Sequence, residues 1–262
     1  MPSIKMLLPQ IADRIDQQFQ SENPGRVDGV MTGIPAFDES LMGFQRGDIS
    51  LLVGEPGVGK TTLAVQMASL ISGFQSDGAV VYISWRESSL HLGLRVIAYS
   101  SGLSLRNFVR GDLRDEDWNS FTESLTRFNE SNLELECISP ELGVLKSVLL
   151  DAVSGFGKQT CLVIIDDCWG YTDDPEEALA FLKWLKSFAL KYKTAVLLTG
   201  TAKQLTGNDK VWGYLSAMSD LTLDLIPEMG TDVSDSNLFV RKQRMGQPFV
   251  ISLKFNEVHL YH

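Results

Sequence analysis

The segment GEPGVGKT, Gly54–Thr61, has the spacing G-x-x-x-x-G-K-[ST] of a phosphate-binding loop. It lies between the apolar run ISLLV, which predicts a strand, and a pattern that predicts a helix, as this motif requires. Glycines let backbone N–H groups turn inward, and the dipole of the following helix adds to the attraction for phosphate. We therefore expect a nucleotide to contact Gly54, Glu55, Pro56, Gly57, Val58, Gly59, Lys60, Thr61 and Thr62.

Three side chains in this region suit catalysis on a nucleoside triphosphate. Lys60 is expected to reach the β- and γ-phosphates, and the Thr61 hydroxyl is expected to ligate Mg²⁺. The apolar run CLVIID brings Asp166 to a strand end, where a carboxylate holds Mg²⁺, usually through water. Two interpretations stay open for Asp167: a second acid that activates water, or the solvated start of a loop. The sequence thus predicts a site for ATP and Mg²⁺.

The run VVYISWRES, Val80–Ser88, predicts a buried strand that ends in a bulky ring and two opposite charges. These groups either solvate the strand end or face a ligand. Because this strand follows the phosphate-loop helix, its end should face the γ-phosphate, which favours the ligand. We expect Arg86 to bind a phosphate, or to pair with Asp166 or Glu87. A guanidinium cannot accept a proton from water near neutral pH, so Arg86 cannot be a general base.

The remaining chain predicts an α/β fold in which a mostly parallel sheet is covered on both faces and extended by antiparallel strands. The parallel strands are expected from five apolar runs: ISLLVG, AVVYIS, LELECIS, CLVIID and TAVLLTG. The helices are expected from KTTLAVQMASLIS, SLHLGLRVIAYSSG, DEDWNSFTESLTRFNE, ELGVLKSVLLDAVS and PEEALAFLKWLKSFALKY. The carboxyl-terminal strands are expected from DLTLDLI, NLFVRKQR, PFVISLKFN and VHLYH.

An amphipathic helix is predicted over 4–20, before the sheet begins. Its apolar residues recur three or four apart, and a polar, turn-rich stretch follows it. We therefore divide the chain into a linker helix and linker, 1–28, and a nucleotide-binding domain, 29–262. The helix either folds back on its own domain or docks on a neighbouring subunit through the stripe formed by Leu8, Ile11, Ile15 and Phe19.

Composition excludes several classes of protein. The chain has 262 residues and a formal net charge of −10, which argues against general attraction to phosphate backbones or anionic membranes. It contains no apolar run near the roughly 18 residues that span a bilayer and no signal pattern, so we expect a cytoplasmic protein without a membrane partner. The cysteines lack metal-ligand spacing and are expected to be reduced and mostly buried: Cys137, Cys161 and Cys168.

Several blocks, in the right order, resemble the RecA-like motor domain of DnaB-type replicative hexameric helicases, with more distant similarity to the KaiC and RadA branches. The resemblance covers nearly the whole chain. It implies a homo-oligomer, a hexameric ring joined through the amino-terminal helix, with ATP between subunits and single-stranded DNA as a possible partner. The blocks are IKMLLPQIADRIDQQFQ, TGIPAFDESLMGFQRGDISLLVGEPGVGKTT, YISWRESSLHLGLRVIAYSSGLSLRNFVRGDLRDEDWNSF, which includes Arg95, and NLFVRKQRMGQPFVISLKFN. The last block carries a K-x-R-x-G element, and the resemblance implies that its Lys242 and Arg244 reach the neighbour's γ-phosphate.

The chain departs from this family at two positions. Where the family's Ser-Leu-Glu-Met-Ser has its catalytic glutamate, this chain has Arg86. Glu87 could replace that glutamate only if a bulge shifted the strand end by one residue, because adjacent strand residues point to opposite faces. Where the family places a γ-phosphate-sensing glutamine, this chain has Gly200. The first departure predicts impaired hydrolysis, and the second predicts a loss of coupling between hydrolysis and movement.

Three hypotheses for the function follow. The first is an ATP-dependent DNA helicase or translocase. The second is a nucleotide-binding protein with little or no hydrolysis, which holds an assembly together or engages a replicative helicase or another replication partner. The third is a KaiC-like regulatory ATPase that binds no DNA. The acidic segment DCWGYTDDPEEA after Asp166 would repel a phosphate backbone, and only Lys203 and Lys210 are basic in the segment after Thr201. In the same two segments, Trp169 and Trp212 either stack on bases or pack in the protein.

Overall fold

A nine-stranded sheet forms the centre of the described part of the chain, in the order β11-β10-β9-β8-β3-β7-β6-β4-β5. The computed structural model describes residues 3–20, 29–74, 78–155, 159–172, 174–201, 209–227, 235–244, 246–255 and 260–261. The strands are β3 (Ile49–Gly54), β4 (Ala79–Ser84), β5 (Leu133–Cys137), β6 (Thr160–Asp166), β7 (Ala195–Thr201), β8 (Leu221–Pro227), β9 (Asp235–Lys242), β10 (Phe249–Phe255) and β11 (Leu260–Tyr261).

The pairing of these strands confirms the predicted fold class. Within the part of the sheet ordered β8-β3-β7-β6-β4-β5, each strand is parallel to the next. By contrast, β9, β10 and β11 extend the sheet with antiparallel pairing. The parallel strands therefore all end at one edge of the sheet, and their first residues lie at the opposite edge.

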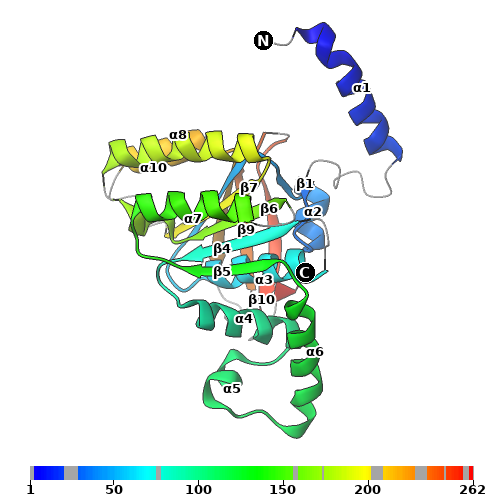
Figure 1. Cartoon of the computed structure of the whole chain (residues 1–262), viewed down its shortest axis with the longest axis vertical. Helices are drawn as coiled ribbons and strands as arrows, with labels where there is room; N and C mark the ends of the chain where they lie inside the picture. The colour runs from blue at the N-terminus through cyan, green and yellow to red at the C-terminus, as the bar shows by residue number, and fades with distance from the viewer. Residues whose placement is uncertain are drawn as a thin grey trace.

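Helices cover both faces of the sheet (Figure 1). One apolar core lies under α3 (Lys60–Phe74) and α4 (Ser89–Ser101). A second lies under α7 (Leu142–Gly155), α8 (Pro175–Tyr192) and α10 (Asp209–Met218). Every residue of β3, β4, β6 and β7 is buried, which confirms the predicted sheet with two covered faces.

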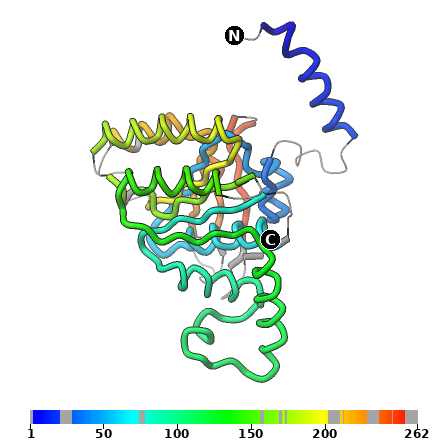
Figure 2. Tube along the Cα trace, viewed as in Figure 1, coloured from blue at the N-terminus to red at the C-terminus, as the bar shows by residue number. Residues whose placement is uncertain are grey.

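Some short elements were not predicted. The helix α5 (Leu105–Arg110) has only six residues, which are too few to show a helical period in the sequence. Ser104 caps its start, and Gly111 ends it in a left-handed conformation. Together with the 3-10 turn η2 (Asp115–Asp117) and α6 (Trp118–Asn129), α5 forms a lobe that extends from the body (Figure 2). The other unpredicted elements are α2 (Pro35–Leu41), β1 (Gly29–Val30), β2 (Phe44–Gln45), the 3-10 turn η3 (Cys168–Tyr171) and α10.

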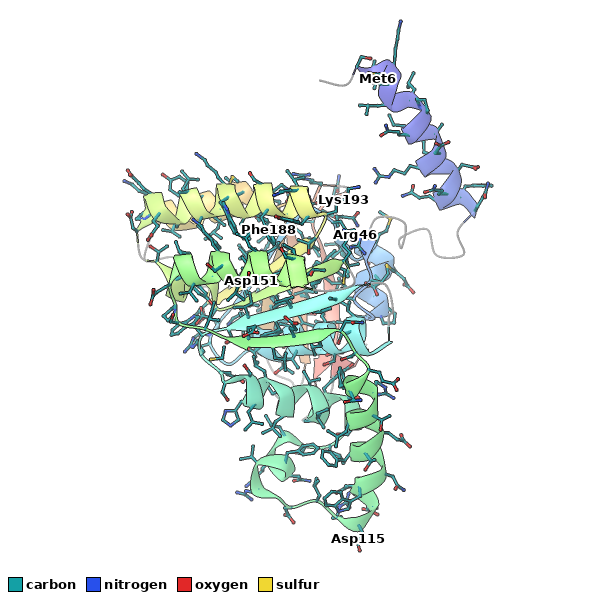
Figure 3. All side chains as sticks on the ribbon, in the orientation of Figure 1. Met6, Arg46, Asp115, Asp151, Phe188 and Lys193 are labelled. Atoms are coloured by element: carbon teal, nitrogen blue, oxygen red, sulfur yellow. The ribbon has the colours of Figure 1, made fainter. Side chains whose placement is uncertain are left out.

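The predicted amino-terminal helix is confirmed as α1 (Ile4–Gln20). It buries none of its residues and stands away from the sheet and its helices (Figures 1 and 3). The exposed fractions of the four residues of the apolar stripe range from 43% at Ile11 to 89% at Phe19. One side chain of α1, Arg14, lies near the domain, because it lines a cavity together with Leu41 and Met42. None of the described helices is long and apolar enough to cross a membrane.

Candidate functional site

The ends of four neighbouring parallel strands form a cleft of about 460 Å³. The phosphate-binding loop follows β3, a bend follows β4, two acidic residues close β6, and three small residues close β7. The cleft is open to solvent, and it gathers most of the predicted site residues. Its lining consists of Pro56, Gly57, Gly59, Lys60, Thr61, Thr62, Arg86, Glu87, Arg95, Asp166, Asp167, Thr199, Gly200 and Thr201.

Two kinds of constraint explain the glycines of the loop. Gly57 and Gly59 have φ angles of 80° and 102°, in the region that side-chain-bearing residues rarely adopt. At Gly54 the constraint is space, because a Cβ there would lie 2.6 Å from the carbonyl oxygen of Leu225 on β8. The backbone can turn its N–H groups toward a phosphate because these positions carry no side chain.

Lys60 lies on the first turn of α3 and reaches back over the loop. Its Nζ donates to the carbonyl oxygens of Gly54 and Glu55, at 3.1 and 2.9 Å. Burial lowers the pKa of Lys60, and the carboxylates of Asp167 and Asp166 act in the opposite direction. The ammonium group is thus held between the loop and the acidic end of β6, in the cleft.

The predicted pair of metal ligands lies together. Thr61 Oγ1 donates to Asp166 Oδ2 at 3.1 Å, and Thr199 Oγ1 donates to Asp166 Oδ1 at 2.5 Å. Thr199 in turn accepts the backbone N–H of Asp167 at 2.8 Å. A hydroxyl and a carboxylate are hard oxygen ligands of the kind that binds Mg²⁺ beside phosphates and water, so this donor set fits the ion.

Arg86 pairs with Asp167, and not with Asp166 or Glu87. Its Nη1 donates to Asp167 Oδ2 at 2.5 Å. The strand β4 ends at Ser84, and the three residues after it form a bend, so strand alternation does not apply to them. The register shift in β4 lies at its other end, between Ala79 and Val80. Arg86 and Glu87 therefore both line the cleft without a bulge at this end of β4.

The carboxylate of Glu87 is already bound on both oxygens. Arg95 on α4 donates to it from Nε at 2.7 Å and from Nη2 at 2.9 Å, a fork-to-fork pair. Glu87 reaches the cleft but is held by this arginine. The sequence suggested Arg95 only as part of a family block, because the spacing between the two residues does not reveal the pair.

Lys242 and Arg244 lie at the opposite edge of the sheet from the phosphate loop, since Lys242 pairs with Thr222 at the start of β8. The Nζ of Lys242 donates to the carbonyl oxygens of Ser216 and Ser219, at 2.6 and 2.7 Å, near the end of α10. Arg244 forms ion pairs with Asp220 and, at 3.4 Å, with Asp48. Within one chain, neither cation contributes to the cleft.

A family described as DnaB-like helicase C terminal domain matches residues 29–166. The chain belongs to this family. The resemblance seen in the sequence is thereby confirmed. Among curated DnaB-like relatives, the replicative DNA helicase DnaC of Bacillus subtilis (strain 168) is 28% identical over 134 residues, which are 51% of this chain and 29% of that protein. The replicative DNA helicase DnaB of Treponema pallidum (strain Nichols) is 23% identical over 96% of this chain and 59% of its own length. The chain thus spans less than two thirds of either relative.

Solved structures share the fold of this DnaB-like domain. One, described as an ATPase domain, superposes with a TM-score of 0.83 at 19% identity, over 98% of this chain and 97% of that one. The structure of a DnaB-like replicative helicase and its interactions with primase gives a TM-score of 0.79 at 20% identity, over 98% of this chain and 65% of that one. These matches cover α1 as well as the sheet, because they extend over nearly the whole chain.

The structure describes only some of the other residues that the sequence of this DnaB-like domain singled out. Lys203 falls outside the described residues, as do the side chains of Trp169 and Trp212. Cys161 is buried, Cys168 is partly buried and Cys137 is exposed, so the predicted burial is wrong for Cys137. Among the described residues, no group of three or more His, Cys, Asp or Glu side chains is placed to hold a metal ion.

Proposed function

We propose that this DnaB-like domain binds ATP with Mg²⁺ in the cleft and acts on DNA as a ring-shaped oligomer with impaired hydrolysis. The observation that carries the proposal is the convergence of Lys60, Thr61 and Asp166 below a glycine loop with two positive φ angles. A cytoplasmic location and six subunits in the ring stay predictions from the sequence and the family.

The glycine loop and several side chains of the cleft have specific roles in this proposal. The loop N–H groups and Lys60 bind phosphate oxygens, and Thr61 and Asp166 would hold Mg²⁺. The bound ion would neutralise charge on the phosphate oxygens. Thr199 orients the Asp166 carboxylate by donating to one of its oxygens. In this proposal Arg86 stands at the position of the family's catalytic glutamate, and a guanidinium cannot act as a general base. The carboxylate of Glu87 is bound by Arg95, so it is not a free general base either.

The trans roles of Lys242 and Arg244 belong to the same proposal. Both lie at the edge of the sheet where the parallel strands begin, so they cannot reach the nucleotide of their own chain. A neighbouring subunit whose cleft faced that edge would receive both cations at its γ-phosphate. Arginine suits this position because its planar fork neutralises charge on the transferred phosphoryl oxygens.

A second candidate function is a nucleotide-binding assembly or regulatory protein, KaiC-like or bound to a replicative helicase, without unwinding activity. The pairing of Arg86 with Asp167 favours this candidate, because it fills the water-activating position with a cation. Both candidates share the ATP site and differ in turnover.

Measuring ATP turnover with and without single-stranded DNA tests the two candidates. We expect slow turnover, with single-stranded DNA giving a reproducible increase if the domain acts on DNA. Turnover that DNA stimulates many-fold, and that Lys60→Ala abolishes while Glu87→Ala leaves it unchanged, would contradict both impaired hydrolysis and a base role for Glu87. Turnover that DNA does not change would favour the second candidate.

Charges placed on the apolar stripe of α1 are expected to disrupt the oligomer. In the double variant Ile11→Glu, Ile15→Glu, each carboxylate would have to be buried if the stripe packs on a neighbouring subunit, at a cost of several kcal/mol. Light scattering should therefore report a smaller particle than for the unsubstituted protein.

The matched control places the same charges on the opposite side of α1. Gln10→Glu, Gln17→Glu changes two exposed polar residues and should leave the particle size unchanged. If the Ile11, Ile15 variant also keeps the full particle size, the stripe is not an intersubunit contact.

A further inference from the structure

Arg86 and Asp167 form an ion pair at the mouth of the cleft, and their surroundings differ strongly. The side chain of Arg86 is 57% exposed, whereas that of Asp167 is 9% exposed. The guanidinium also lies over the ring of Trp85, with Cζ 5.5 Å from the ring centroid. The carboxylate is therefore fixed in the protein, and the long arginine side chain reaches it from the solvent side.

The backbone of Asp167 holds the carboxylate in place. Its φ and ψ angles are 57° and 64°, a left-handed conformation that residues with a side chain seldom adopt. The N–H of Asp167 donates to Thr199 Oγ1 at 2.8 Å, and its carbonyl oxygen accepts from Trp85 Nε1 at 2.8 Å. Because both backbone groups are bound, the partner that can move is Arg86.

Only one of the two carboxylate oxygens of Asp167 accepts a hydrogen bond from the described part of the chain. Oδ1 of Asp167 is buried and has no hydrogen-bond partner among the described residues, so Arg86 supplies the hydrogen bond to Oδ2 alone. Asp167 also lies near enough to Lys60 to raise the pKa of that lysine against the effect of burial. If Arg86 left, the carboxylate would therefore keep a nearby positive charge.

We propose that this ion pair is the γ-phosphate sensor of the chain: ATP draws Arg86 from Asp167 to the γ-phosphate, and ADP leaves the pair closed. The inference rests on the proposed function, in which the cleft binds ATP. A terminal phosphate attracts a guanidinium more strongly than one carboxylate oxygen does, because it offers several charged oxygens to the planar fork. The loop and Lys60 hold the inner phosphates of both nucleotides. Gly200, which also lines the cleft, has no side chain with which to sense the γ-phosphate.

Affinities for ATP and ADP in two variants test the sensor, because the variants are expected to act in opposite directions. Arg86→Gln should weaken ATP binding about tenfold or more, since one charge-assisted contact to the γ-phosphate is lost, and should change ADP binding less than about twofold. Asp167→Asn should tighten ATP binding by roughly threefold to tenfold, because Arg86 no longer has to leave a carboxylate. A purely structural pair would instead shift both nucleotides in the same direction in both variants.

Another arginine variant serves as the control, and the fluorescence of Trp85 reports the position of Arg86. Arg241→Gln removes another exposed arginine from an ion pair, with Asp224, and should change neither affinity. In the unsubstituted protein, ATP but not ADP should change the fluorescence that Trp85→Phe removes, since Arg86 leaves the indole ring only with ATP. Equal losses of ATP and ADP affinity in Arg86→Gln, or an equal fluorescence change with both nucleotides, would overturn the sensor. If the unsubstituted protein binds neither nucleotide, the proposed function itself is wrong.

Discussion

Replacing Lys60 with alanine is expected to weaken ATP binding by about 100-fold or more, through loss of the cation that bridges the inner and terminal phosphates. The Nζ of Lys60 is already positioned by the carbonyl oxygens of Gly54 and Glu55, so little conformational freedom is lost when a phosphate binds. The dissociation constants of ATP and ADP, measured by calorimetry, report the effect. Both nucleotides should be affected, in contrast to the variants of Arg86.

The control for this variant is another lysine-to-alanine change far from the cleft. Lys183 lies exposed on α8, and Lys183→Ala should leave both dissociation constants unchanged. Thermal unfolding of both variants without nucleotide shows whether folding is intact. An affinity within about threefold of the unsubstituted protein in folded Lys60→Ala would show that the glycine loop does not bind phosphate.

Replacing Asp220 with alanine is expected to lower the free energy of unfolding by about 3–5 kcal/mol, as for other buried ion pairs that lose one partner. Its carboxylate accepts from Lys186 Nζ at 2.6 Å and from the backbone N–H of Ile49 at 2.8 Å, and it also pairs with Arg244. The side chains of Asp220 and Lys186 are 6% and 17% exposed. The variant would leave a nearly buried ammonium and a buried N–H with fewer partners.

Urea unfolding measures this change, and an exposed ion pair between β8 and β9 provides the comparison. Asp224 pairs with Arg241, whose side chain is 54% exposed, so Asp224→Ala should cost no more than about 1 kcal/mol. Similar losses in the two variants would show that the Asp220 cluster contributes no more than an ordinary surface ion pair.

Much of the fold could be predicted from the sequence because burial on two faces leaves a simple pattern. The strands β3 and β6 are buried throughout and mostly apolar, and the loop motif fixes the direction of β3 relative to α3. Short or interrupted segments could not be predicted in this way. The segment that forms α10 contains Gly213 and reads as part of a loop in the sequence; it forms a helix because its apolar residues Val211 and Leu215 are buried in the core beneath α8.

The sequence was sufficient to bring together the glycine loop and the proposed metal ligands, but not to predict the ion pairs of the cleft. Lys60, Thr61 and Asp166 follow from spacing and strand ends, which the sequence displays directly. The partner of Arg86 depends on a single left-handed residue, Asp167, which turns its carboxylate toward the end of β4. No local sequence pattern predicts this left-handed conformation. An aspartate can adopt it, but most aspartates do not.

The strand β3 runs from the edge of the sheet that carries Arg244 to the edge that carries the phosphate loop. Asp48, which pairs with Arg244, directly precedes β3, and β3 ends at Gly54, the first glycine of the phosphate loop. Six residues of extended chain span about 20 Å, so β3 runs directly from one end to the other. In the proposed ring, β3 would therefore lie between the nucleotide held by its own phosphate loop and the Arg244 side chain that reaches a neighbour's nucleotide.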